Sequence, residues 1–245
     1  MFVVLGCFAL LFVSHAGVCG QEGRTYDGLI EPSEIVKLSS PVQGTVETMA
    51  VERGDRVRKG QVIARLNSAV EKSAVELAQA RVEFAKRKVL RNEDLYQKEL
   101  ISIHEKDEME TELKVAELQL REAKERLDLR VIRSTVNGVV VERFLSPGDY
   151  VGEYPILKIA CIHPLNVELV VPAQDYGSIR RGMLAEVRPE LGVSGKFSAR
   201  VVIVDTVIDA ASGTFGVRLE MPNPDFRLPA GLKCKVIFPP GQKKP

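Results

Sequence analysis

The middle of the chain carries apolar residues at the spacing of two long amphipathic helices. Between Asn67 and Leu129 they recur every three or four residues, and this stretch contains no proline. The apolar positions of the first helix are Val75, Ala78, Val82, Ala85 and Val89, and those of the second are Met109, Leu113, Ala116, Leu120, Ala123 and Leu127. S-x-x-E sequences at Ser68–Glu71 and Ser102–Glu105 predict a capping box at the start of each helix. We therefore predict an α-helical coiled-coil hairpin, with facing apolar seams and a tip near residues 95–104.

Alternating apolar and polar residues in the last third of the chain predict β-strands. Four such segments follow His163: Val167–Val171, Phe197–Ile203, Phe215–Met221 and Leu232–Phe238. A stretch at 173–181, ended by Gly182, predicts one short helix among them. An earlier strand-like segment, Thr25–Leu38, is expected to join these strands. Together they predict a small antiparallel β-barrel, because closure of a sheet removes its exposed edges.

An internal repeat flanks the predicted hairpin. The pattern G-x9-G-D-x-V begins at Gly44 and again at Gly138, so its second glycines are Gly54 and Gly148. We expect the first glycine of each copy to lie in a strand where backbones approach closely or bend, and Gly-Asp to form a tight turn. Neither half can close a core alone. The two halves therefore predict one lipoyl-like β-sandwich that the hairpin splits.

The predicted fold class is mainly β with an inserted helical hairpin. The expected divisions of the chain are a signal peptide at 1–20, a β-barrel domain at 21–38 and 163–240, a lipoyl/biotinyl-like domain at 39–67 and 131–162, the hairpin at 68–130, and a disordered tail at 241–245.

The first twenty residues have the character of an export signal. The apolar run from Phe2 to Val13 is too short to span a bilayer comfortably, and small residues follow it. A cleaved signal peptide predicts an exported protein, and the family resemblance given below implies the periplasm. A lipid anchor at Cys19 is the alternative. Cys161 and Cys234 lie within apolar strand patterns, so they are interpreted either as buried free thiols or as a disulfide.

Composition and motifs give no reason to expect several classes of function. The 34 basic and 33 acidic residues leave a net charge of +1, which gives no sign of a nucleic-acid partner. Beyond the signal the only histidines are His104 and His163, and no nucleophile elbow, phosphate loop or paired ligand motif surrounds them. Metal capture would need clustered Met, His or Cys near the mature N-terminus, and the sequence has no such cluster there. We therefore predict a non-enzymatic protein with no catalytic, cofactor or metal site.

The order of these parts resembles the periplasmic adaptor subunits of tripartite efflux pumps, the membrane fusion proteins of the HlyD-like family. The segment Val131–Val140 is similar to the family's return from the hairpin into the lipoyl-like domain, with Ser134-Thr135 in place of the usual Ala-Pro. Three later segments resemble the closing barrel segments of adaptors that serve resistance-nodulation-division transporters: Asp209–Phe215, Pro222–Asp225 and Leu228–Leu232.

The resemblance implies partners at both membranes. An Arg-x3-Leu-x6-Ser pattern at the hairpin tip of such adaptors contacts the outer-membrane channel, and Arg91, Leu95 and Ser102 have that spacing here. Ser102 is also explained by helix capping alone. The resemblance further implies an inner-membrane transporter as partner and self-association into a ring, as a hexamer or a trimer of dimers, without any cofactor. The implied task is a sealed conduit for the export of small molecules.

Two alternatives stay open. The chain could serve an ATP-driven exporter or a one-step secretion system, although the closing barrel segments favour a resistance-nodulation-division pump. The half-motifs also resemble a lipoyl or biotinyl carrier domain. Such a carrier presents a modified lysine between its halves, where this chain has Asn67-Ser68 and the hairpin.

Overall fold

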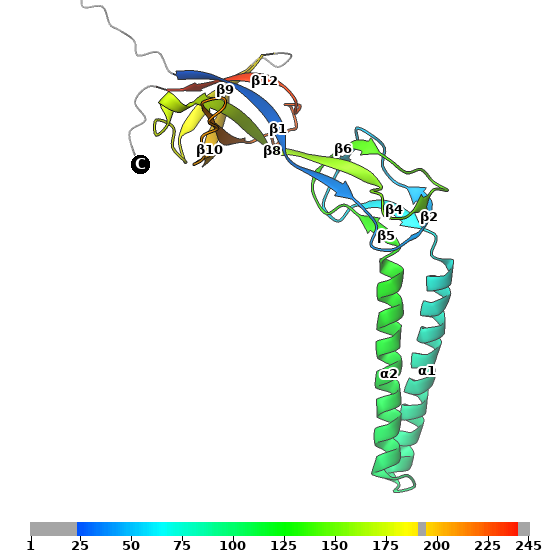
Figure 1. Cartoon of the computed structure of the whole chain (residues 1–245). Coiled ribbons are helices and arrows are strands. Elements are labelled where there is room, and N and C mark those ends of the chain that lie inside the picture. The colour runs from blue at the N-terminus through cyan, green and yellow to red at the C-terminus, as the bar shows by residue number, and fades with distance from the viewer. Residues whose placement is uncertain (1–23, 191–194, 240–245) are drawn as a thin grey trace, which may run out of the picture.

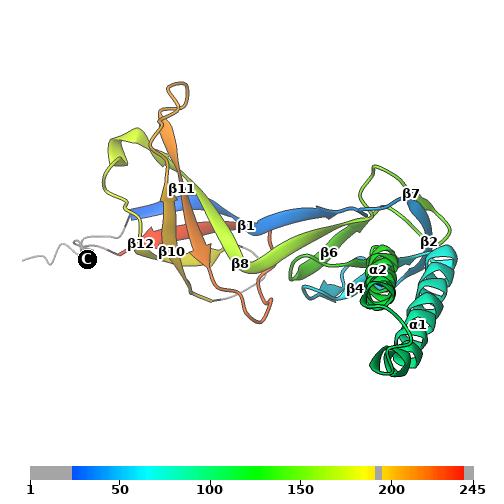
Figure 2. The same cartoon turned by 90° about the horizontal axis from the view of Figure 1, so that it is seen from below.

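The computed structural model describes residues 24–190 and 195–239. A barrel, a sandwich and a helical hairpin follow one another, and the hairpin turns away from the line of the first two, so that the molecule is L-shaped (Figure 1). Figure 2 views the hairpin along its length, with α1 and α2 side by side. The predicted signal peptide at 1–20, the alternative lipid anchor at Cys19 and the predicted disordered tail at 241–245 lie outside the described residues.

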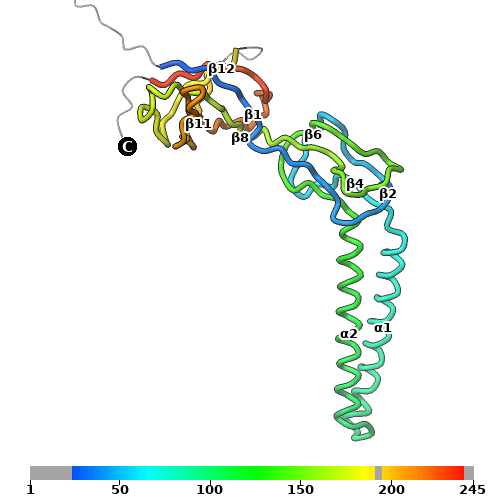
Figure 3. Tube along the Cα trace, in the orientation of Figure 1, coloured from blue at the N-terminus to red at the C-terminus, as the bar shows by residue number. Residues whose placement is uncertain are grey.

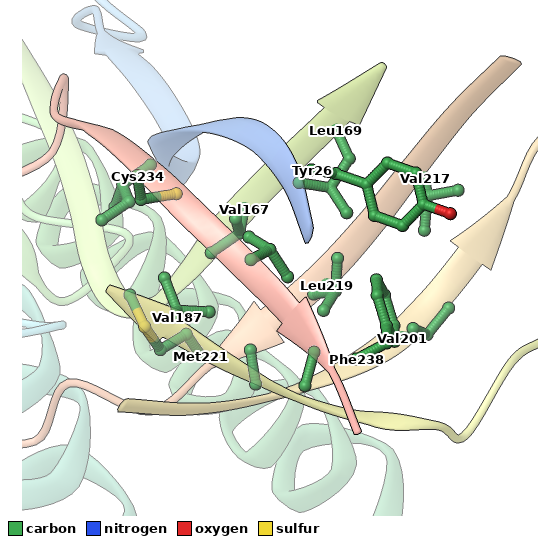
Figure 4. Packing of buried hydrophobic residues seen from close by; sticks show 14 of the residues in the cluster. Tyr26, Val167, Leu169, Val187, Val201, Val217, Leu219, Met221, Cys234 and Phe238 are labelled. Atoms are coloured by element: carbon green, nitrogen blue, oxygen red, sulfur yellow. The ribbon is translucent and has the colours of Figure 1, made fainter. Parts of the chain in front are cut away.

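The barrel is a closed antiparallel sheet of six strands. Its strands are β1 (Arg24–Leu38), β8 (Leu157–Pro172), β9 (Leu184–Pro189), β10 (Phe197–Val204), β11 (Thr214–Met221) and β12 (Lys233–Phe238). Their order is β1-β12-β9-β10-β11-β8, and β8 pairs with β1 to close the ring, as predicted. Alternate side chains point inward and form one buried core (Figure 4).

Two details of the barrel differ from the prediction. The expected helix at 173–181 is only a 3-10 turn, Ala173–Asp175, because the backbone becomes extended at Tyr176, with a ψ of 134°, and Gly177 follows with a φ of 83°. Strand β9 was not predicted, although Ala185 and Val187 alternate with polar residues and are buried.

Strands β1 and β8 extend beyond the barrel into the sandwich. They pair from Gly28 with Leu169 in the barrel to Leu38 with Leu157 in the sandwich. The ladder is irregular only where the two parts meet: Pro32 pairs with Leu165 and Glu34 pairs with Cys161, which sets three residues of β8 against one of β1. The barrel and the sandwich thus share two strands.

Backbone and side-chain groups of a barrel loop bind the residues at this irregular crossing. The backbone N–H of Asn223 donates to Nδ1 of His163 at 3.0 Å, and its side-chain amide donates to the carbonyl of Ile162 at 2.9 Å. Close by, the Arg56 guanidinium of the sandwich lies 4.8 Å from the ring centre of Phe226 in the same barrel loop. These contacts hold the two parts together at their junction.

The sandwich is built from both halves of the repeat. Its strands are β2 (Gly44–Met49), β3 (Arg56–Val57), β4 (Val62–Leu66), β5 (Val131–Arg133), β6 (Gly138–Arg143) and β7 (Tyr150–Val151), with the shared ends of β1 and β8. Val46 and Val140, from different halves, are 1% exposed and belong to one core cluster. Figure 3 shows the chain leaving this sandwich into one helix and returning to it from the other.

Equivalent strands of the two halves pair with each other in a reciprocal way. Gly44 pairs with Val151, and Gly138 pairs with Val57, so the first glycine of each half lies opposite the valine of the other half's G-D-x-V. The turns bind across in the same way: Gly54 N–H donates to the carbonyl of Val140, and Gly148 N–H donates to that of Val46. This reciprocal bonding explains why the motif occurs twice.

The hairpin consists of α1 (Ala69–Gln97, 29 residues) and α2 (Ile103–Asp128, 26 residues). At a rise of about 1.5 Å per residue, its length is about 40 Å. Val82 and Ala85 of α1 pack on Ala116 of α2, with Leu113 and Leu120 partly buried beside them. All five are positions of the predicted seams, which therefore face each other.

The predicted capping box at Ser68 is wrong. Ser68 is the N-cap residue of α1, but its side chain makes no capping hydrogen bond. Instead the side-chain oxygen of Asn67 accepts the N–H of Ala69 at 3.2 Å, and the Glu71 carboxylate binds Arg130. A long-range ion pair thus replaces the local bond that the sequence indicated.

Candidate docking site at the hairpin tip

At the tip, α1 ends in a hydrogen-bonded C-terminal cap. Leu100 N–H donates to the carbonyl of Leu95 at 2.9 Å, and Glu99 N–H donates to that of Tyr96 at 2.8 Å. These are the two bonds of a Schellman motif, which needs a left-handed residue at the position of Glu99. Glu99 has a φ of 59°. The chain therefore reverses within five residues and leaves a compact tip.

A capping box starts α2, as predicted. The hydroxyl oxygen of Ser102 accepts Glu105 N–H at 3.2 Å, and a Glu105 carboxylate oxygen accepts Ser102 N–H at 2.7 Å. The Ser102 hydroxyl also donates to this oxygen. Hydrogen bonds from the backbone and then the side chain of Ser102 hold the pKa of Glu105 below its ordinary value of 4.5.

This cap predicts a pH dependence of hairpin stability. Because the pKa of Glu105 is lowered by folding, its contribution is complete above pH 4.5 and is lost as the pH falls through the lowered value. We expect Ser102→Ala to cost about 1 kcal/mol at pH 7. The difference from the wild type should shrink below pH 4.5, as followed by helical circular dichroism during heating. A difference that stays constant down to pH 3 would contradict this assignment.

Cross-helix pairs hold the two ends of the helices together behind the tip. The Lys106 ammonium lies 3.0 Å from the Glu93 carboxylate and 4.5 Å from the centre of the Tyr96 ring. The hydrogen bond to Glu93 is the largest effect raising the pKa of Lys106. Farther from the tip, Lys88 of α1 binds Glu112 of α2 at 2.6 Å. These contacts hold α1 and α2 together next to the tip.

The three predicted docking residues lie in the terminal turns of the hairpin. Arg91 and Leu95 are one turn apart on the same face of α1, and Ser102 opens α2. Arg91 and Ser102 are exposed, and Leu95 is half-buried. Within the described residues no atom bonds the Arg91 guanidinium. The tip therefore offers a cation beside an apolar side chain, whereas Ser102 is already occupied by its cap.

At the opposite end, Arg130 ties the hairpin to the sandwich. Its Nη1 donates to the carbonyl of Gln43 at 2.8 Å, and its Nη2 donates to Glu71 in the first turn of α1 at 2.5 Å. A Cβ on Gly44 would lie 2.6 Å from Nη1. Gly44 therefore makes room for this arginine. Sequence reasoning missed Arg130 because its partners are distant in the chain.

The other three motif glycines serve two different purposes. Gly54 and Gly148 adopt φ values of 95° and 94°, the left-handed region that favours glycine in turns. Gly138 lies in β6, and a Cβ there would collide with the backbone carbonyl oxygen of Ala160. Turn conformation explains the first two, and close strand approach explains the third.

The described residues contain no group of three or more His, Cys, Asp or Glu arranged to hold a metal ion. Cys161 and Cys234 are both free and buried, which decides between the two interpretations of the sequence. Burial raises the pKa of the Cys161 thiol, and it raises that of Cys234 to about 11. No helix in the described part of the chain is long and apolar enough to cross a membrane.

Two family models of known domains match the chain. The family model of CzcB-like barrel-sandwich hybrid domains matches residues 34–160, just over half of the chain. That of CusB-like β-barrel domains matches residues 165–241. The multidrug resistance protein MdtA of Escherichia coli is 25% identical, over 82% of this chain and 54% of its own length. The chain spans about half the length of the curated relatives it matches.

Solved structures share the fold. A MacA–MexA chimeric protein, which contains the Pseudomonas aeruginosa MexA α-hairpin domain, superposes with a TM-score of 0.74 at 18% identity, covering 90% of this chain and 81% of the chimera. A putative efflux transporter from Bacteroides eggerthii gives a TM-score of 0.68 at 21% identity, over 87% and 67%. The family resemblance noted in the sequence is thus confirmed, and the chain belongs to the membrane fusion protein family, with a CzcB-like barrel-sandwich hybrid domain followed by a CusB-like β-barrel domain.

Proposed function

We propose that this chain is a periplasmic adaptor that links an inner-membrane transporter of the resistance-nodulation-division type to an outer-membrane channel. The hairpin carries this proposal: two helices of 29 and 26 residues project from the sandwich and end in a compact capped tip. A rod with an exposed end is suited to reach a distant partner. The name of the Escherichia coli relative, a multidrug resistance protein, supports small molecules as the exported substrates.

The tip is proposed to dock on the channel through Arg91 and Leu95. An exposed guanidinium that no described residue bonds can bind carbonyl or carboxylate oxygens, and an adjacent leucine can fill an apolar groove. Ser102 supports the tip from within, since its hydroxyl and N–H are used by the capping box. The hairpin itself is proposed to be an antiparallel coiled coil, which would keep the tip stiff.

The barrel and the sandwich are proposed to pack beside further copies of themselves and to form a ring on the transporter. The chain divides, in this proposal, into barrel, sandwich and inserted hairpin along the lines expected from the sequence, with β1 and β8 shared by the first two. Together the copies seal a conduit. The transporter supplies the energy, so the adaptor is proposed to need neither a cofactor nor an enzymatic site.

The proposed location is the periplasm, at the surface of the inner membrane. The apolar start of the sequence supports export by a cleaved signal peptide, and a lipid anchor at Cys19 would place the chain on the same surface. Expression of the chain with Cys19→Ala and measurement of the mature mass distinguishes the two.

A deletion and co-purification experiment tests the proposed function. Cells that lack the chain should become more sensitive to exported compounds, and the tagged chain should co-purify with a multi-span transporter and an outer-membrane channel. Recovery of an ATP-driven transporter would favour the alternative exporter or secretion system. Wild-type resistance in the deletion strain, with neither protein recovered, would refute the adaptor role.

A further inference from the structure

A cleft lies where the hairpin joins the sandwich. It has a volume of about 310 Å³, and residues of β2, β4, α1 and α2 line it. Figure 1 shows these elements meeting at the base of the hairpin. Clefts of roughly 300 Å³ and above hold small ligands. A ligand in this cleft would therefore contact the hairpin and the sandwich at the same time.

Basic side chains outnumber acidic ones on the walls of this cleft. The basic residues are Arg65, Lys72, Lys124 and Arg130, and the acidic ones are Glu47 and Asp128. Arg130 already binds Gln43 and Glu71. Among the described residues the other three cations form no ion pair, so no carboxylate of the chain neutralises them at close range. Unpaired cations around one cleft favour an anion as its ligand.

One wall of the cleft carries a hydroxyl that has no partner in the described part of the chain. Ser68 lines the cleft and is 8% exposed, yet its side chain forms no capping bond and no other described residue bonds it. The described residues contain no fully enclosed side-chain oxygen or nitrogen that lacks a partner, so this hydroxyl opens into the cleft. A buried hydroxyl without a hydrogen bond costs free energy. A ligand oxygen beside it would remove that cost.

The start of α1 favours the same class of ligand. Ser68 is the N-cap residue of this 29-residue helix, so the cleft lies at the positive end of the helix dipole. Glu71 is in the first turn as well, but Arg130 binds its carboxylate. At the opposing end of α2, the N–H of Arg130 donates to the carbonyl of Leu127 at 3.1 Å. The helix dipole of α1, the cations and the hydroxyl together select an oxyanion.

We propose that this cleft is an oxyanion site that binds a phosphate group, either as inorganic phosphate or in a phosphomonoester. Phosphate carries up to two negative charges and accepts hydrogen bonds in several directions, which suits donors that come from three elements. Arg65, Lys72 and Lys124 supply the positive charge, and the Ser68 hydroxyl donates to a phosphate oxygen. Bound phosphate would therefore bridge β4, α1 and α2. The site goes beyond the adaptor role and does not depend on it.

Calorimetric titration of the full chain with inorganic phosphate, in a phosphate-free buffer, tests the site. The wild type should show saturable binding. Ser68→Ala and Lys124→Gln should each weaken it at least about tenfold, because each removes a hydrogen bond to a charged ligand. Lys114→Gln is the matched control: Lys114 is exposed on α2 but does not line the cleft. It should change the affinity less than about twofold, and circular dichroism checks that all three variants fold.

Thermal unfolding separates a binding role of Ser68 from a structural one. Because no described residue bonds the Ser68 hydroxyl, Ser68→Ala should melt at the wild-type temperature in a phosphate-free buffer. Phosphate should raise the melting temperature of the wild type above that in sodium chloride of equal ionic strength, and Ser68→Ala should lose most of this rise. A Ser68→Ala chain that phosphate stabilises as much as the wild type would overturn the proposal.

Glycerol 3-phosphate as a second probe distinguishes the two sources of the phosphate group. Binding of both probes would show that the site accepts a phosphomonoester, and binding of inorganic phosphate alone would show that it takes the free ion. Equal affinity of phosphate for the wild type, Lys124→Gln and Lys114→Gln would indicate unselective attraction to surface charge and would overturn the proposal, as would the absence of saturable binding. Co-purification with transporter and channel tests the adaptor role separately, so the two failures are distinguishable.

Discussion

Replacing Gly138 with alanine is expected to destabilise the sandwich by about 3 kcal/mol, because the new methyl group has no room. A Cβ at this position would overlap the carbonyl oxygen of Ala160 and lie 2.7 Å from Cγ2 of Ile159. The oxygen belongs to β8, which is anchored in both β domains, so it cannot yield as the end of a flexible side chain would. Separation of β6 from β8 is the only relief, and that separation opens the core.

Urea unfolding measures this effect. The chain contains no tryptophan, so tyrosine fluorescence and circular dichroism follow the transition. Gly152→Ala is the matched control, since a Cβ at Gly152 would meet nothing within 4 Å and its φ lies outside the left-handed region. We expect this control to stay within about 0.5 kcal/mol of the wild type. If Gly138→Ala were equally harmless, the close approach of β6 and β8 described above would be wrong.

Reversing the charge at Arg91 is expected to abolish export while the protein still accumulates. The Arg91 side chain is exposed and bonds no described residue, so Arg91→Glu removes no bond within the described part of the chain and should leave its stability unchanged within about 0.5 kcal/mol. At a docked tip, however, the new carboxylate would face the acceptor oxygens that the guanidinium is proposed to bind. Drug resistance should therefore fall to the level of cells that lack the chain.

Arg87→Glu is the control for this variant. Arg87 is also exposed on α1, one turn nearer the sandwich and outside the Arg-x3-Leu-x6-Ser pattern. It should retain most resistance, while immunoblots show equal amounts of both variants. Full export by Arg91→Glu, or equal loss in both variants, would remove the docking role from the tip.

Features set by residues close in sequence were predicted well. The seams of α1 and α2 follow from three- and four-residue spacing, and the cap at Ser102 follows from one S-x-x-E sequence. The paired core of the sandwich was predictable because the same glycine, aspartate and valine pattern occurs twice. The barrel was predictable from alternation, except β9, in which only Ala185 and Val187 are buried and Pro189 ends the strand.

Features made by residues distant in sequence were not predicted. Arg130 binds Gln43 and Glu71, which precede it by 87 and 59 residues, so no local sequence pattern predicts these two bonds. The same ion pair takes the carboxylate that a capping box at Ser68 would need. Leu77, Phe84 and Val115 also lie off the predicted seam. They line one groove because the packed hairpin brings α1 and α2 side by side.

The strands β1 and β8, which run unbroken from one β domain into the other, determine how those domains can move. A joint of two paired strands resists opening, because opening would break its ladder, but it yields to torsion about its long axis. The single irregularity opposite Ser33 is where such torsion should concentrate. Since the hairpin stands at an angle to that axis, a small rotation there would swing the distant tip through a wide arc. The L-shape would thus convert a small torsion at the crossing into a large displacement of the hairpin tip.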